Sequence, residues 1–186
     1  MSTPSEGAPV SAAIESPAFR TRNVATAFAG LVLVAGCFAR FGLEPEAFVG
    51  SFFAVVLLVL SVIDLEHRII PDRIVLPATA VVLASQLVFF PGRGLEWVLA
   101  SIGAALFFLL PILVYPQGMG MGDVKLALLL GAGLGAAVVS ALVVALLAVF
   151  LVACAILLRG GREARRRTIP FGPFLAFGGL VALFFA

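Results

Sequence analysis

Long apolar runs separated by short charged loops constrain this chain more than any other feature. A helix needs about 20 consecutive apolar residues to cross a ~30 Å hydrocarbon core, and the chain holds several runs of about that length. Because 62% of its residues are hydrophobic and only 12% are charged, it also differs from ordinary globular domains, which are about a quarter charged. The sequence therefore predicts an all-α, polytopic transmembrane helical bundle.

The runs divide into about seven predicted membrane segments. They are about Asn23–Phe41, Phe48–Asp64, Arg73–Phe90, Trp97–Tyr115, a short fifth from Asp123, Ala136–Leu158, and a seventh from Pro170 to the C-terminus. The stretch Asp123–Leu158 would be about 54 Å long as one helix. We therefore expect a break within Gly131–Gly135, although the limits of the fifth segment stay open.

The N-terminal residues 1–22 differ in composition from the rest of the chain. They are rich in Ser, Pro, Ala and Glu without apolar periodicity, which is typical of a disordered tail. We expect this tail to be cytoplasmic and to carry no removable signal peptide. Residues 23–186 would then form one membrane-embedded domain, with a six-helix core from about residue 48 preceded by one extra span.

Loop charges predict the orientation, because Lys and Arg are retained on the cytoplasmic side of a membrane. The loop Arg159–Arg167 holds five arginines and is therefore placed inside. Alternating back from it leaves ten of the twelve basic residues inside and only Arg40 and Arg93 outside. The C-terminus is then expected outside, and Asp64 and Asp123 fall at the same, cytoplasmic, face.

Asp64 and Asp123 are the candidate catalytic residues, because each is a carboxylate at the end of an apolar segment. Such a group is costly at a membrane boundary and by default indicates function. Two carboxylates in contact cannot both stay ionised, so one holds a proton while the other remains a base. Peptide hydrolysis needs both an acid and a base, and the pair would supply them.

The loop before Asp123 reads Gly118-Met119-Gly120-Met121-Gly122. Alternating glycines permit unusual backbone angles and close approach of another chain, so we expect Gly120 and Gly122 to support the active-site loop. Lys125 is expected either to reach toward the interface or to modulate a nearby carboxylate. Asp72, which follows Pro71, is interpreted as a helix N-cap.

Three pieces of the sequence together resemble the type IV prepilin peptidases, intramembrane aspartyl proteases of the GxGD class. The pieces are Asp64 followed by IIPD, GMGD with Lys125-Leu126, and TIPFGPFLA near the C-terminus. The resemblance covers roughly Phe48 to the C-terminus and implies that Asp64 and Asp123 are the catalytic pair. It implies a multi-pass protein of the cell membrane.

The resemblance also implies a substrate, the basic leader of a type IV prepilin or secretion-system pseudopilin, cut at the cytoplasmic face. Many bacterial members carry an N-terminal domain with two CxxC pairs that is linked to methylation, and these cysteines are missing here. We therefore expect a peptidase-only member that needs no cofactor or metal. Its expected partners are the precursor and membrane lipids, with no nucleic acid. Its oligomeric state stays open.

Two other functions are compatible with the same carboxylates. A proton- or cation-coupled transporter could use Asp64 and Asp123, although both lie toward one face and not near the midplane, and no internal repeat is evident. A catalytically silent assembly subunit of the same fold is the second alternative. Retention of both aspartates argues against that loss of activity.

Overall fold

The computed structural model describes residues 17–115, 120–160 and 170–185. The described part is all-α, as predicted, with two short 3-10 turns between α-helices. The elements are α2 (Pro17–Phe41), α3 (Pro45–His67), α4 (Asp72–Phe89), η1 (Pro91–Arg93), α5 (Gly94–Val114), α6 (Met121–Leu134), η2 (Gly135–Ala137), α7 (Val138–Gly160) and α8 (Gly172–Phe185).

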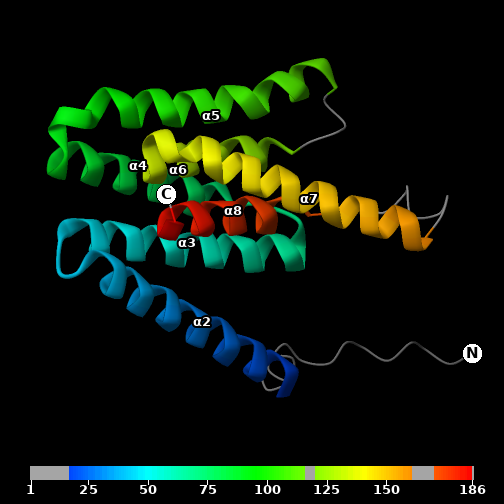
Figure 1. Cartoon of the computed structure of the whole chain (residues 1–186). Coiled ribbons are helices and arrows are strands. Elements are labelled where there is room, and N and C mark those ends of the chain that lie inside the picture. Colours follow the sequence, from blue (N-terminus) through cyan, green and yellow to red (C-terminus); the bar gives the residue numbers. More distant parts are fainter. Residues whose placement is uncertain (1–16, 116–119, 161–169, 186) are drawn as a thin grey trace, which may run out of the picture.

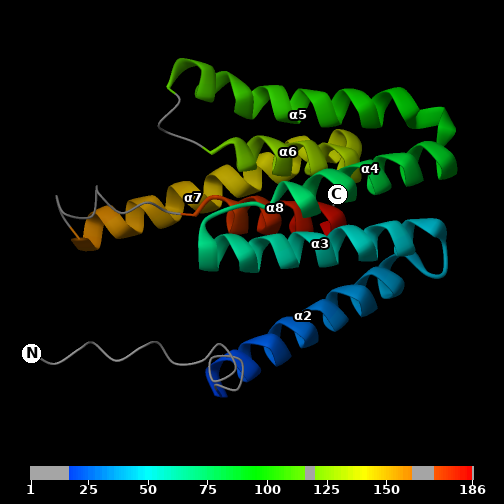
Figure 2. The ribbon, with the colours of Figure 1, turned by 180° about the vertical axis from the view of Figure 1, so that it is seen from behind.

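Successive helices run in opposite directions, so the bundle has two ends (Figure 1). Helix α3 ends where α4, α6 and α8 begin, and this is the end predicted to be cytoplasmic, called the inner end below. Figure 2 shows the same arrangement from behind, with α2 splayed away from the other helices. In agreement, only 6% of the apolar window of α2 is buried, against 50% for α3.

Helix lengths support a polytopic membrane protein. Five described stretches are long and apolar enough to cross a membrane, one of them the combined run Met121–Leu158. Helices α6 and α8 have 14 residues each, about 21 Å, which is shorter than a ~30 Å core. Each predicted segment corresponds to one described helix, but the number of crossings stays a prediction. Helix α2 begins at Pro17, before the predicted boundary.

The predicted break in the long apolar run is confirmed, and it lies at Gly135. Helix α6 ends at Leu134, and Gly135 has φ +56°, a conformation that glycine adopts without steric cost. A Cβ atom at this position would also lie 2.8 Å from the ring of Trp97. The glycine therefore allows the chain to turn sharply from α6 into α7 against α5.

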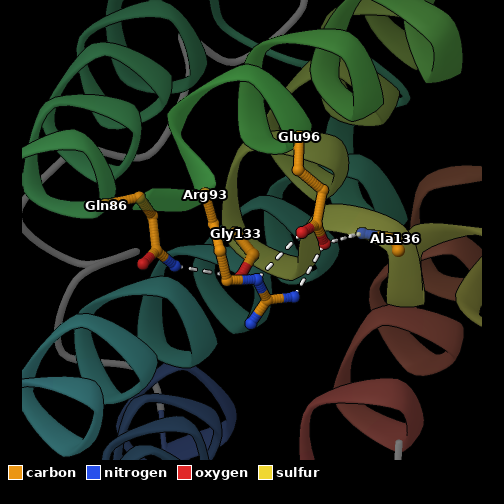
Figure 3. Close-up of polar contacts among 5 residues, drawn as sticks. All are labelled: Gln86, Arg93, Glu96, Gly133 and Ala136. Carbon is orange, nitrogen blue, oxygen red and sulfur yellow. Dashed lines mark hydrogen bonds and ion pairs between the residues drawn. The ribbon is translucent and has the colours of Figure 1, made fainter. Parts of the chain in front are cut away.

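A polar cluster holds this turn at the outer end of the bundle (Figure 3). Arg93 donates to both carboxylate oxygens of Glu96, at 2.8 and 2.7 Å, and the amide of Ala136 donates to the same carboxylate at 3.1 Å. The Nε2 atom of Gln86 donates to the carbonyl of Gly133 at 3.3 Å. The contacts of Gln86 with Gly133 and of Glu96 with Ala136 tie α4 and α5 to the end of α6 and the turn after it, while Arg93 holds the Glu96 carboxylate in place.

Helix α6 is enclosed by its neighbours, which fixes the residues at its start. Seven of its side chains and Gly131 are buried. A Cβ at Gly131 would lie 2.6 Å from the carbonyl carbon of Ala100 on α5, and one at Gly133 would lie 2.6 Å from the ring of Phe53 on α3. The Ser101 hydroxyl also donates to the Leu128 carbonyl at 2.7 Å. Small residues of this kind let membrane helices approach closely.

Candidate active site

Asp64 lies in the last turn of α3, at the inner end, with its side chain turned into the bundle. The residue is only 6% exposed and lies near the end of a long apolar helix, which ends at His67. Arg68, in the left-handed conformation at φ 54°, caps the helix by donating its amide to the Asp64 carbonyl at 2.9 Å. The sequence after Asp64 thus ends the helix at once and leaves the carboxylate at its end.

The carboxylate of Asp64 has a partner from the far end of the sequence. Its Oδ2 atom accepts a hydrogen bond of 3.0 Å from the amide of Gly172, the first residue of α8. The amides of a helix's first turn have no acceptor within their own helix, so this contact satisfies one of them. The inner ends of α3 and α8 are therefore joined directly at the carboxylate.

Asp123 lies in the first turn of α6, at the same end of the bundle as Asp64 (Figure 1). It is partly buried, and its amide donates to the carbonyl of Gly120 at 3.1 Å. The fold thus places both sequence-predicted catalytic candidates at the inner end of the bundle.

Gly120 and Gly122 flank this start of α6 in different ways. Gly120 is the N-cap, with an extended backbone at φ −82° and ψ 146°. Gly122 packs on the α3–α4 connection, where a Cβ atom would lie 2.9 Å from the Cβ of Ile70. Neither glycine has a positive φ, so the expectation of unusual backbone angles is wrong for both. Gly122 does allow another part of the chain to approach closely, as expected.

Lys125 contacts Asp72 and not the catalytic candidates. Its Nζ atom lies 2.6 Å from Asp72 Oδ1, with the two side chains 26% and 57% exposed. Asp72 is the first residue of α4, whose N-cap is Pro71 and lacks a side-chain hydrogen bond, so the interpretation of Asp72 as an N-cap is wrong. The ion pair instead ties the start of α4 to the start of α6, beside Asp123.

Two contacts of this region were not predicted from the sequence, namely those of Ile70 with Gly122 and of Gly172 with Asp64. The signal for the second was present, because Gly172 and Pro173 mark the start of the last apolar segment. Among the described residues, no group of three or more His, Cys, Asp or Glu side chains is placed to hold a metal ion.

The fold defines a class, a polytopic helical membrane protein with two carboxylates, Asp64 and Asp123, at one end of its bundle. Comparison with known proteins identifies the family. The model of the type IV leader peptidase family matches residues 51–158, a range that contains both aspartates. The chain belongs to the type IV leader peptidase family.

Similar proteins are named prepilin leader peptidase/N-methyltransferase. One from Burkholderia pseudomallei (strain 1026b) is 36% identical over 162 residues, covering 82% of this chain and 51% of that protein. Another from Stutzerimonas stutzeri is 33% identical, covering 68% and 46%, and one from Bacillus subtilis (strain 168) is 29% identical, covering 81% and 60%. The chain thus spans about half the length of these relatives. No solved structure matches it.

Proposed function

We propose that the chain is an intramembrane aspartic endopeptidase that removes the leader peptide of type IV prepilins or pseudopilins. The observation that carries the proposal is that Asp64, in the last turn of α3, and Asp123, in the first turn of α6, lie at the same end of the bundle. Membership of the leader peptidase family supports the reaction. The names of the relatives support the substrate, and the proposal concerns the peptidase activity alone.

The two carboxylates would divide the work of hydrolysis between them. Two carboxylates close together keep one proton between them at neutral pH. The ionised member takes a proton from water as the water oxygen bonds to the scissile carbonyl carbon, and the protonated member gives its proton to the carbonyl oxygen. The tetrahedral intermediate then collapses and the C–N bond breaks as the leaving nitrogen takes up the proton that came from the water. One hydroxyl of the intermediate returns its proton to the second carboxylate, which restores the singly protonated pair.

The inner end of the bundle is proposed to face the cytoplasm of a cell membrane. The support is the distribution of basic residues, ten of which lie on this side in the predicted topology. The basic leader would be cut there, and the C-terminus would lie outside. We also propose a membrane peptidase domain of residues 23–186. Of the tail of residues 1–22 expected before it, residues 17–22 belong to α2 and residues 1–16 lie outside the described part of the chain.

A cleavage assay tests the proposal. The purified chain in lipid is mixed with a prepilin-type precursor, and release of the leader is followed by the change in mobility and by mass spectrometry. Asp64→Asn and Asp123→Asn are each expected to abolish cleavage at unchanged expression and membrane insertion, because each removes the acid or the base. Asp72→Asn is the matched control, because Asp72 lies nearby but outside the pair. Full activity in either pair variant would refute the assignment.

A further inference from the structure

The contact between Asp64 and the start of α8 has features that go beyond helix packing. Asp64 is almost fully buried, and a buried carboxylate is costly unless it is hydrogen-bonded or paired. Its Oδ2 atom is engaged by the Gly172 amide at 3.0 Å. The hydrogen bond fixes one oxygen of the side chain, so the direction of the other oxygen is fixed as well.

Only glycine permits this contact. A Cβ atom at position 172 would lie 2.6 Å from Oδ2 and 2.9 Å from Cγ of Asp64, separations that real Cβ atoms essentially never show, and 3.1 Å from its Cβ. Any larger residue would therefore displace either the carboxylate or the first turn of α8. Gly172 thus affects the Asp64 carboxylate in two ways: its missing side chain leaves room for the carboxylate, and its amide donates a hydrogen bond to it.

The amide at the start of α8 and the charge of Arg68 both stabilise the ionised form of Asp64. Asp64 lies in the last turn of α3, where the partial negative charge of a helix C-terminus disfavours a carboxylate. The Gly172 amide is at the positive end of α8 and donates to the carboxylate, which favours the anion. Arg68, on the C-cap of α3, adds a favourable charge. Burial of Asp64 is the largest influence and acts in the opposite sense.

Asp123 also has support for a negative charge, because it lies in the first turn of α6 and its carboxyl interacts with the backbone of Gly120. Asp64 accepts a hydrogen bond from the Gly172 amide, and the positive charge of Arg68 adds a smaller favourable effect. Because a close carboxylate pair holds a single negative charge near neutral pH, the position of this charge depends on which member has the better placed donors.

We propose that Gly172 is a positioning residue that holds Oδ2 of Asp64 and keeps this carboxylate ionised, so that Asp64 is the base and Asp123 the acid. The roles of base and acid rest on the proposed peptidase function, whereas the position of the proton does not. A water proton would pass to Oδ1 of Asp64 as the oxygen attacks the peptide carbonyl carbon. The proton of Asp123 would pass to the carbonyl oxygen.

Infrared titration of the full chain in lipid vesicles tests where the proton lies, without any substrate. In the Asp123→Asn variant only Asp64 of the pair titrates, and in Asp64→Asn only Asp123 does, with the double variant subtracted as background. We expect Asp64 to become half ionised at a lower pH than Asp123. Gly172→Ala, added to Asp123→Asn, is expected to raise the half-ionisation pH of Asp64 by about one unit, a tenfold change in the equilibrium.

Gly103→Ala is the matched control for this titration, because a Cβ at Gly103 on α5 would meet no atom within 4 Å. It is expected to leave both titrations unchanged. If Gly172→Ala does not fold, the comparison of the two single-aspartate variants decides alone. The proposal is overturned if Asp123 ionises at the lower pH, or if a folded Gly172→Ala variant titrates as its parent does.

A kinetic measurement then separates the two proposals. In an active preparation, Gly172→Ala is expected to lower kcat at least tenfold with little change in KM, and to move the acidic limb of the pH–rate profile to higher pH. A purely structural role would lower the amount of active protein and leave the profile in place, which would refute the positioning role. If no precursor is cleaved at all, the peptidase proposal fails while the titration still reports the proton.

Discussion

Replacing Gly131 by alanine perturbs the position of Asp123 from a distance. Gly131 lies on α6, eight residues and about 12 Å along the helix from Asp123. A Cβ there would lie 2.6 Å from the carbonyl carbon of Ala100, and also closer than 3 Å to the neighbouring backbone atoms of α5. Backbone atoms of a helix cannot rotate away as a side chain can. Helices α5 and α6 must therefore separate.

The contact distances set the size of the effect. Carbon atoms prefer separations of about 3.5 Å or more, so the helices must move apart by about 1 Å. Overpacking of this kind typically costs about 1–3 kcal/mol. The movement also strains the hydrogen bond from Ser101 to the Leu128 carbonyl, which contributes about 1 kcal/mol. A loss of about 2–4 kcal/mol in the free energy of unfolding follows.

The effect on catalysis is expected to be larger than the effect on binding. Because Asp123 moves with α6, its carboxyl would be misplaced relative to Asp64, and a misplacement of about 1 Å can lower a rate about 100-fold. The assay is steady-state cleavage of a precursor by protein in detergent, with chemical unfolding of the same preparation. We expect kcat to fall by about 10- to 100-fold, with KM changed by less than about threefold.

Gly103→Ala is again the control, because it adds the same methyl group to α5 where there is open space. It is expected to leave both stability and kcat unchanged. Wild-type stability together with wild-type kcat in Gly131→Ala would refute the claim that close packing of α5 on α6 positions Asp123. A loss of stability without a change in kcat per folded molecule would refute the claim that this packing matters for catalysis.

Other substitutions have smaller or reversible expected effects. Asp72→Asn and Lys125→Met should each lower the free energy of unfolding by at most about 1 kcal/mol, because the pair is partly exposed, and both should keep cleavage within about threefold of wild type. A charge-reversed double variant that restores the single losses would confirm the pairing. Glu96→Gln should lower the thermal midpoint without changing the pH dependence of cleavage, since its contacts lie at the outer end; a changed pH profile would contradict this. Gly133→Ala should destabilise α6 against Phe53, and Phe53→Leu in the same chain should relieve part of the loss, as a double-mutant cycle would show.

The sequence predicted the helices and their ends well, for identifiable reasons. Apolar length is a strong signal in a membrane protein, and Gly135 was within the range expected to break the long run. Charged residues between the runs placed Asp64 and Asp123 at one end, and the described helices α3 and α6 do place both at the inner end. These features depend on residues close together in the chain.

Contacts between distant segments could not be predicted in the same way. Gly172 and Asp64 are 108 residues apart, and Lys125 and Asp72 are 53 apart. Membrane helices are apolar on the lipid face as well as on the inner face, so the pattern of a single sequence does not indicate which residues point inward. Asp72 was misinterpreted because its position after a proline suggested a cap, whereas Pro71 itself occupies that position.

The most direct test of the central claim is a double-mutant cycle on the aspartate pair. Single-turnover cleavage would be measured for wild type, Asp64→Asn, Asp123→Asn and the double variant at high enzyme concentration. If the carboxylates act as one acid–base unit, each single variant should lose nearly as much rate as the double variant, because removing either member disables both. Losses that multiply, with the double variant far slower than either single variant, would contradict a joint mechanism.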